Sequence, residues 1–169
     1  MTGDQARFFA EQVVGTLRQE FATTVKVLEA VNDEKRDYRP DPKSRSAWDL
    51  ARHIATSDVW FLNSALDGKF VSDPAAQKAA EEQFSNVAEV VAFYKKAFGA
   101  AIDRAAAASG DDMARTVDFF GMMQLPAVSF LMLTNNHSIH HRGQLSAYLR
   151  AGGSKVPDIY GPSGDSEKG

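Results

Sequence analysis

The sequence predicts an all-α protein whose core is a four-helix bundle. Apolar residues recur every three or four positions along four long segments, and the segments between them contain the Pro and Gly residues that end helices. Size supports the same prediction, because 169 residues with 44% hydrophobic content fill one core but not two. We therefore expect one domain over residues 1–153 and a polar tail over residues 154–169.

The first predicted helix covers residues 5–32, in which the apolar residues form one continuous stripe. Pro40 and Pro42 then predict a loop, because the residue before a proline avoids helical dihedral angles. The predicted stripe consists of Phe9, Val13, Leu17, Phe21, Val25, Leu28 and Val31.

The second predicted helix covers residues 47–66. Ser46 and Asp49 resemble a capping box at its start, with Asp in place of the usual Glu. Gly68 suits its end, because glycine tolerates the left-handed conformation that closes a helix. We interpret residues 69–85 as a connection in which an Asp-Pro pair starts a short helical turn.

The third predicted helix begins near Val87 and ends at Ser109, and the fourth runs from Pro126 to Arg150. Residues 111–125 alternate only weakly, so we expect an extended or irregular segment that folds over one end of the bundle. The connections before and after the third helix are long enough for a crossover, which leaves the order of the helices open.

Composition excludes several classes of function. A formal charge of -3 and a pI near 5.8, without a run of Lys or Arg, argue against nucleic-acid binding. The absence of cysteine excludes disulfides and thiolate ligands and suits the cytoplasm. The charged N-terminal segment does not resemble a signal peptide, and the longest apolar run, residues 125–133, is too short to span a membrane.

Three of the four histidines lie in residues 135–144. Because an α-helix has about 3.6 residues per turn, His137 and His141 point the same way, along the predicted inward stripe. Neutral imidazoles bind Zn, Ni, Fe or Cu, and this spacing can hold one ion. His140 falls on a more polar neighbouring face, so we favour the pair, although an i,i+3 pairing of His137 with His140 is also geometrically allowed.

The fourth histidine, His53, lies on the border of the apolar face of the second helix, from which it can face the fourth. An alternative is that the imidazoles only satisfy hydrogen bonds in the core. We interpret Asp49 as a cap and Asp58 as part of a solvated face. Arg142 is expected to face solvent or to pair with a carboxylate, and Gly143 to allow close approach of another helix.

Two segments carry a resemblance to a known family. Residues 48–55, Trp-Asp-Leu-Ala-Arg-His-Ile-Ala, and residues 137–144, with the pattern His-x-x-x-His-Arg-Gly-Gln, resemble the DinB/YfiT-like metalloprotein superfamily. The weaker motifs at residues 38–40, 152–157 and 159–162 also resemble members of this superfamily. The resemblance extends over nearly the whole chain.

The resemblance implies a four-helix bundle that binds one divalent metal ion, nickel or zinc, and forms a homodimer. Carried over residue by residue, the metal ligands are His53, His137 and His141. His140 and Gln144 are then candidates for hydrogen bonding near the site.

Three functions follow as hypotheses. The first is a metal-dependent enzyme, a hydrolase or a transferase that joins a low-molecular-weight thiol to an electrophilic small molecule, because some relatives carry out bacillithiol or mycothiol S-transfer and maleylpyruvate isomerisation. The second is a metal-binding stress-response or interaction protein without turnover. The third is a core in which the histidines bind no metal. Neither catalytic residues nor a substrate are identified by the sequence.

Overall fold

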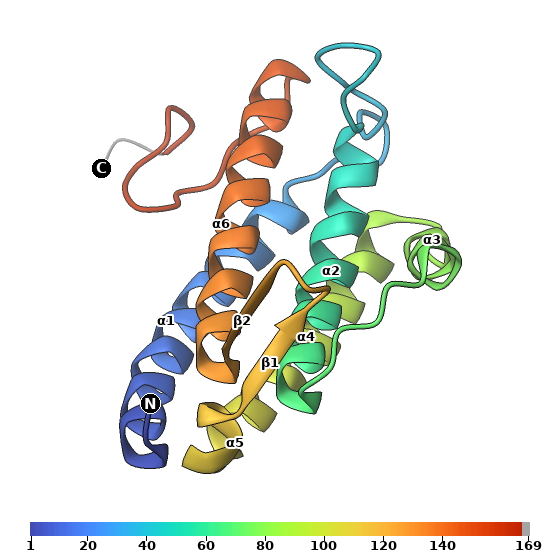
Figure 1. The fold of residues 1–169 in the computed structure, drawn as a ribbon. Coiled ribbons are helices and arrows are strands. Elements are labelled where there is room, and N and C mark those ends of the chain that lie inside the picture. Colours follow the sequence, from blue (N-terminus) through green and yellow to red (C-terminus); the bar gives the residue numbers. More distant parts are fainter. Residues whose placement is uncertain (167–169) are drawn as a thin grey trace.

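A computed structural model describes residues 1–166, and in this range four long helices form the bundle (Figure 1). They are α1 (Gly3–Glu29), α2 (Ala47–Asp67), α4 (Val87–Ala107) and α6 (Ala127–Ala151). The connections contain the short helices α3 (Pro74–Glu82) and α5 (Gly110–Ala114) and the strands β1 (Thr116–Phe119) and β2 (Met123–Pro126). The predicted all-α bundle is confirmed.

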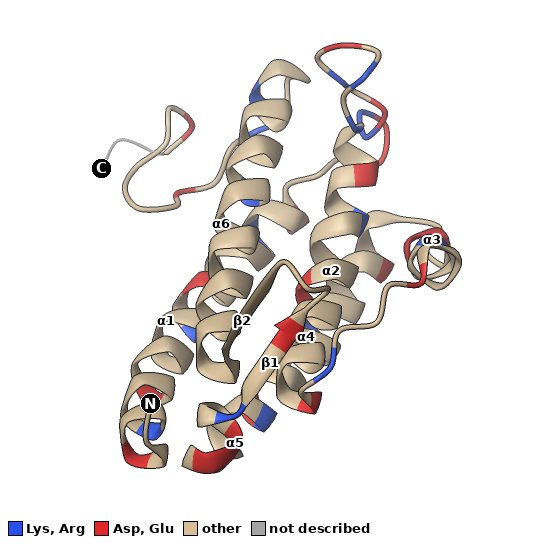
Figure 2. Ribbon diagram, in the orientation of Figure 1, with Lys and Arg blue, Asp and Glu red and all other residues tan. Residues whose placement is uncertain are grey.

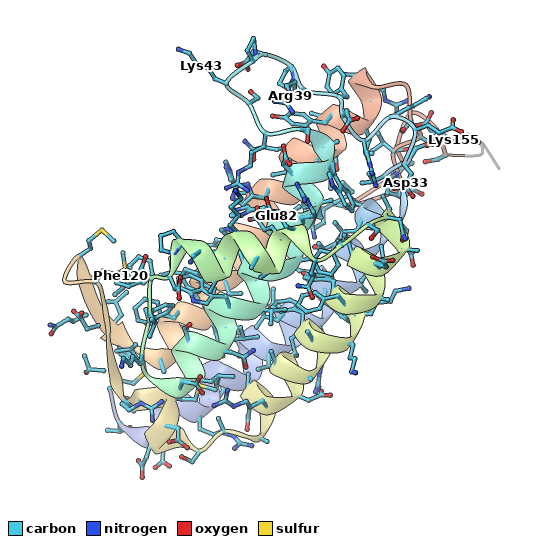
Figure 3. The ribbon with its side chains drawn as sticks, turned by 90° about the vertical axis from the view of Figure 1, so that its right-hand side faces the viewer. Asp33, Arg39, Lys43, Glu82, Phe120 and Lys155 are labelled. Carbon is cyan, nitrogen blue, oxygen red and sulfur yellow. The ribbon has the colours of Figure 1, made fainter. Side chains whose placement is uncertain are left out.

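The helices are ordered by a crossover rather than by simple up-and-down winding. Both α1 and α2 pack against α4 and α6. The backbone N–H of Val87 donates to Asp33 at 3.1 Å, and Arg7 donates to the carbonyl of Ala108 at 3.2 Å, so α4 runs antiparallel to α1. Consequently α1 and α6 run in one direction and α2 and α4 in the other (Figure 1). The crossover between α2 and α4 carries α3, which packs against α2 (Figure 3).

The predicted ends of α2 are confirmed. Ser46 and Asp49 form a capping box in which each accepts a backbone N–H from the other, at 3.1 and 3.2 Å. Gly68 closes the helix with φ of 74°. The short turn expected near Asp73 extends to nine residues, because the Asp73 side chain caps α3 and Pro74 occupies its first turn.

Residues 111–125 are more regular than the sequence predicts. After α5, β1 and β2 pair antiparallel with Thr116 opposite Pro126. Phe120 (φ 54°) and Gly121 (φ 73°) form the turn, and Phe120 lies at its tip (Figure 3). Phe119 packs on Phe70 with ring centroids 4.9 Å apart, and the hairpin lies along the side of α2 and α6 rather than over the end of the bundle (Figure 1).

Two sequence interpretations are wrong. Phe9 is 47% exposed, and Ala6 and Ala10 take the inward positions instead. Small residues fit there because α1 packs against α5 at this end. Among residues 1–166, a Cβ added at Gly143 would meet nothing within 4 Å, so this glycine serves no close helix contact there.

The C-terminal segment packs on the bundle through more than polar contacts. Val156 and Ile159 lie against the hydrophobic core. Tyr160 donates a hydrogen bond of 2.9 Å to Glu20 on α1. The segment therefore fastens α6 to α1.

Charged residues are distributed over the surface without a face of one sign in the view of Figure 2. The loop between α1 and α2, for example, carries both acidic and basic residues (Figure 2). In residues 1–166, none of the helices combines the length and the apolarity that crossing a bilayer requires.

Candidate metal centre

The antiparallel packing of α2 and α6 brings three histidines together. His137 and His141 face His53 from adjacent turns of α6, and the ring centroids are separated by 5.2 Å (His53–His137), 4.8 Å (His53–His141) and 4.5 Å (His137–His141). One ring nitrogen from each residue lies within 4.8 Å of the other two. All three side chains are partly buried.

The fourth histidine lies apart from this cluster. His140 is exposed, as its position outside the inward stripe predicts. Its ring is 4.9 Å from that of His141, but it belongs to the outer surface of α6. The structure therefore brings together the three histidines that the family resemblance implies and leaves His140 in solvent.

A buried carboxylate orients His137. The Oδ1 atom of Asp58 lies 2.8 Å from Nδ1 of His137, and the hydroxyl of Tyr94 donates to Oδ2 of Asp58 at 2.9 Å. Asp58 and Tyr94 are both fully buried. Burial, together with the negative charge of Asp58, raises the pKa of Tyr94 well above its ordinary value, so the hydroxyl keeps its proton.

Oxygen atoms also lie beside Nδ1 of the other two rings. Oε1 of Gln144 is 2.8 Å from Nδ1 of His141, one turn away on the same helix. Nδ1 of His53 is 3.0 Å from the hydroxyl of Ser57 and 3.2 Å from Oε1 of Glu81, which α3 supplies. Partners of this kind fix the orientation and tautomer of metal-binding imidazoles. In all three rings Nε2 remains for a ligand.

The cluster fits a metal ion in its donor chemistry. Three imidazole nitrogens without cysteine suit Zn, Ni or Fe, and three protein ligands leave a coordination position open, as in catalytic sites. Nitrogen ligands on one tetrahedral zinc lie about 3.3 Å apart, since Zn–N bonds are about 2.0–2.1 Å.

A cavity of about 510 Å³ adjoins the cluster between α2 and α3. Its lining includes His53 and His137, so the histidines form part of its wall. The largest apolar walls come from Trp60, Phe61 and Val71. Polar and small residues complete the lining: Arg45, Thr56, Ser57, Asp73, Ala76, Gln77, Ala80 and Glu81. A molecule in this cavity would lie beside the histidines.

Electrostatics keep two of the imidazoles neutral. Burial, helped by the positive charge of Arg45 and by the other two rings, lowers the pKa of His53 to about 3. Burial also lowers the pKa of His141, against the hydrogen bond to Gln144, which raises it. A neutral imidazole is the form that binds metal, so protons compete weakly for these two rings near neutral pH.

The lowered pKa of His53 predicts a pH-dependent stability of the metal-free protein. Its folded pKa is below the ordinary value of 6.5, so the unfolded chain binds more protons and stability falls as the pH drops from 6.5 towards 3. Taken in full, a pKa lowered from 6.5 to about 3 would reduce the free energy of unfolding by about 2 kcal/mol at pH 5. Because the ring is partly exposed and Glu81 lies beside it, we expect a loss of about 1 kcal/mol.

Urea unfolding with a chelator at about pH 7.5 and about pH 5 measures this loss. The His53→Asn variant should lose about 1 kcal/mol less on acidification than the wild type, whereas His140→Asn should behave as the wild type does. The same loss in all three proteins would contradict the assignment to His53.

Sequence reasoning missed the residues that support the histidines. Asp58 is fully buried, so its assignment to a solvated face is wrong. A signal was present, because Asp58 lies four residues after Ile54 and four before Leu62, both of which are completely buried. Glu81 had no such signal, because its approach to His53 depends on how α3 packs against α2.

Arg142 was expected either to face solvent or to pair with a carboxylate, and the first of these is wrong. It is 1% exposed and does not face solvent. The alternative expectation is confirmed, since its guanidinium lies 2.6 Å from the carboxylate of Glu20. Nη2 of Arg142 also donates to the hydroxyl of Tyr160 at 2.7 Å. The residue after His141 thus anchors α6 to α1 and to the C-terminal segment.

The fold and the site together define a class of helical-bundle protein in which two antiparallel helices bring three histidines together beside a cavity. The sequence model of the DinB family matches residues 6–167. The chain belongs to the DinB family.

Solved structures share this fold. A DinB-like protein from Bacillus cereus superposes with a TM-score of 0.74 over 89% of this chain and 97% of that one, at 26% identity. The protein YjoA of Bacillus subtilis is 25% identical over 151 residues, which cover 89% of this chain and 96% of YjoA, and its structure gives a TM-score of 0.68.

A more distant likeness is to the mycothiol-dependent maleylpyruvate isomerase. Its structure superposes with a TM-score of 0.62 over 80% of this chain, and this chain spans 60% of its length. The identity is 13%, so this likeness concerns the fold alone.

Proposed function

We propose that this chain is a divalent-metal-dependent enzyme that transfers a low-molecular-weight thiol to an electrophilic small molecule. The observation that carries the proposal is the convergence of three imidazoles, each with an oxygen at Nδ1, beside a cavity whose wall includes two of them, His53 and His137. His53, His137 and His141 would hold the ion, with nickel or zinc as the proposed metal. A bound divalent ion supplies Lewis acidity, which lowers the pKa of a thiol or a water molecule.

The cavity indicates what the second substrate must be. Trp60, Phe61 and Val71 offer an apolar wall beside His53 and His137, so an apolar electrophile would bury its body there. In the reaction, the thiol sulfur forms a bond to the electrophilic carbon, the leaving group takes the electron pair of the broken bond, and the thiol proton passes to solvent. The fold that the chain shares with a mycothiol-dependent isomerase supports the choice of a thiol. A reduced thiol requires a reducing compartment such as the cytoplasm.

The proposal predicts a metal-dependent conjugation rate. Protein reconstituted with nickel or zinc should conjugate cysteine to chlorodinitrobenzene at least about 10-fold faster than the same protein with a chelator, because the ion increases the thiolate fraction. Absorbance of the dinitrophenyl thioether measures the rate. His53→Ala should reduce the rate to that of the chelated protein, whereas His140→Ala should leave it unchanged.

Two other outcomes separate the competing functions. A protein that binds metal but gives equal rates with and without it would be a non-catalytic metal-binding protein, and the enzyme proposal would fail. A protein that takes up neither ion would leave the histidines as hydrogen-bonded core residues. We further propose a homodimer, which sedimentation of the metal-loaded protein tests.

A further inference from the structure

A continuous series of polar side chains crosses the interior of the bundle behind the histidines. Each contacts the next within 3.5 Å, in a part of the protein otherwise filled by apolar residues. All are at least 98% buried. In order from the site, they are Asp58, Tyr94, Ser138, Thr24 and Arg142.

The chemistry of the two ends sets the direction of these hydrogen bonds. Arg142 can only donate, and it donates to the Thr24 hydroxyl at 3.3 Å. The hydroxyls of Thr24 and Ser138 are 3.3 Å apart, and that of Ser138 is 3.5 Å from the hydroxyl of Tyr94. At the other end, a carboxylate only accepts, and Asp58 accepts from Tyr94 at 2.9 Å. The hydroxyl protons therefore point from Arg142 towards Asp58.

The carboxylate of Asp58 determines which nitrogen of His137 carries the proton. One oxygen of Asp58 receives the Tyr94 proton, and the other lies 2.8 Å from Nδ1 of His137. A carboxylate oxygen at that distance requires N–H at Nδ1. Nε2 then has a free lone pair and points away from Asp58.

We propose that Tyr94 is a positioning residue whose hydroxyl holds Asp58 in place, and that the carboxylate so placed keeps His137 in the tautomer whose Nε2 can bind a metal. Metal binding by His137 rests on the proposed function, but the tautomer belongs to the metal-free protein. Tyr94 itself is not among the residues that line the cavity, and its hydroxyl donates to Asp58. Its ring is held independently of the hydroxyl, stacked on Phe98 with centroids 5.0 Å apart.

In Asp58→Asn, we expect the proton of His137 to move from Nδ1 to Nε2. Because Tyr94 donates, the amide oxygen of the new side chain must face Tyr94, and its NH₂ group must face His137. Nδ1 of His137 then has to accept, so the proton moves to Nε2 and the metal-binding lone pair is lost. We expect the affinity for zinc to fall about 100-fold, at the upper end for a residue that supports a ligand.

Removing the Tyr94 hydroxyl should then rescue the Asn variant. In Tyr94→Phe/Asp58→Asn the amide is free to turn and to offer its oxygen to Nδ1 of His137. We expect the original tautomer to return and zinc affinity to recover about 10-fold relative to Asp58→Asn alone. Tyr94→Phe alone should keep the wild-type tautomer, because the Asp58 carboxylate still only accepts, and should weaken zinc binding by up to about 10-fold, because Asp58 is held less firmly. A purely structural role for Tyr94 predicts additive losses and no rescue.

The experiment uses long-range proton–nitrogen NMR spectra of the imidazole rings in the metal-free protein, with zinc affinity measured by competition against a chelating dye. Tyr160→Phe is the matched control, because it also removes one tyrosine hydroxyl, at the far side of Arg142, while the Arg142–Glu20 pair remains. It should leave the tautomer and the affinity unchanged.

Several results would overturn the inference: an unchanged His137 tautomer in Asp58→Asn, no rescue in the double variant, or an equal effect of Tyr160→Phe and Tyr94→Phe. If the double variant does not fold, Tyr94→Phe decides by itself, and a zinc affinity equal to that of the wild type counts against the proposal. If the wild type binds no zinc, the proposed function fails, and the NMR spectra still decide the role of Tyr94.

Discussion

Replacing His137 or His141 by alanine is expected to reduce nickel or zinc affinity at least about 100-fold, because two imidazoles alone bind these ions far more weakly than three. His140→Ala is expected to keep wild-type affinity. All three residues lie on α6 within two turns, but His140 is exposed whereas the other two face His53. Isothermal titration of each chelated and dialysed variant with the metal measures the difference.

The comparison among these variants tests the geometry directly. They differ in the position of the missing imidazole and in little else, since each substitution places a strong helix former on the same helix. A loss of similar size at His140 would show that the ion is held from the outer face of α6. Unchanged binding in the His137 and His141 variants would remove the proposed centre altogether.

Replacing Arg142 by alanine is expected to destabilise the metal-free protein by about 3–5 kcal/mol, because it leaves a buried carboxylate without its partner. Arg142 is 1% exposed, and the side chain of Glu20 is 14% exposed. The substitution also removes the donor to Thr24 and one anchor of the C-terminal segment, Tyr160. The free energy of unfolding in urea measures the loss.

A surface pair provides the control for this prediction. Arg104 contacts Asp67 at 2.5 Å, but both side chains are about half exposed, at 48% and 57%. Arg104→Ala should therefore change stability by less than about 1 kcal/mol. The double variant Glu20→Gln/Arg142→Ala should recover part of the loss, since no unpaired charge remains. Equal effects of Arg142→Ala and Arg104→Ala would refute the assignment of Arg142 as a buried anchor.

Local patterns in the sequence were sufficient to predict the four long helices. The apolar stripe of α4 and the Ser46–Asp49 cap of α2 depend on interactions within a few residues, so the sequence alone is enough to predict them. Phe9 is a position at which helical periodicity predicts burial incorrectly. Its spacing fits the stripe, but the packing of α5 against α1 favours the smaller Ala6 and Ala10 at the interface.

In the candidate site, too, some features follow from local sequence patterns and others depend on contacts between helices. Spacing along one helix predicts that His137 and His141 share a face. The position of His53 on the second helix allowed it to face the fourth, and the family resemblance implied that it is a ligand. Asp58 lies on the buried face of α2, four residues from Ile54 and from Leu62, so helical periodicity predicts its burial. Whether a buried carboxylate has hydrogen-bond partners depends on residues of other helices. Tyr94 comes from α4 and His137 from α6, and neither is near Asp58 in sequence.

By itself, the sequence determined the four long helices, the ends of α2 and the one-turn pair of imidazoles, because hydrogen bonding and side-chain periodicity within a helix are local. Only the tertiary structure decided the crossover order, the meeting of His53 with that pair, the approach of Glu81 from α3 and the polar series from Arg142 to Asp58. These features depend on contacts between residues far apart in the chain. Their energies depend on burial, which no short segment specifies.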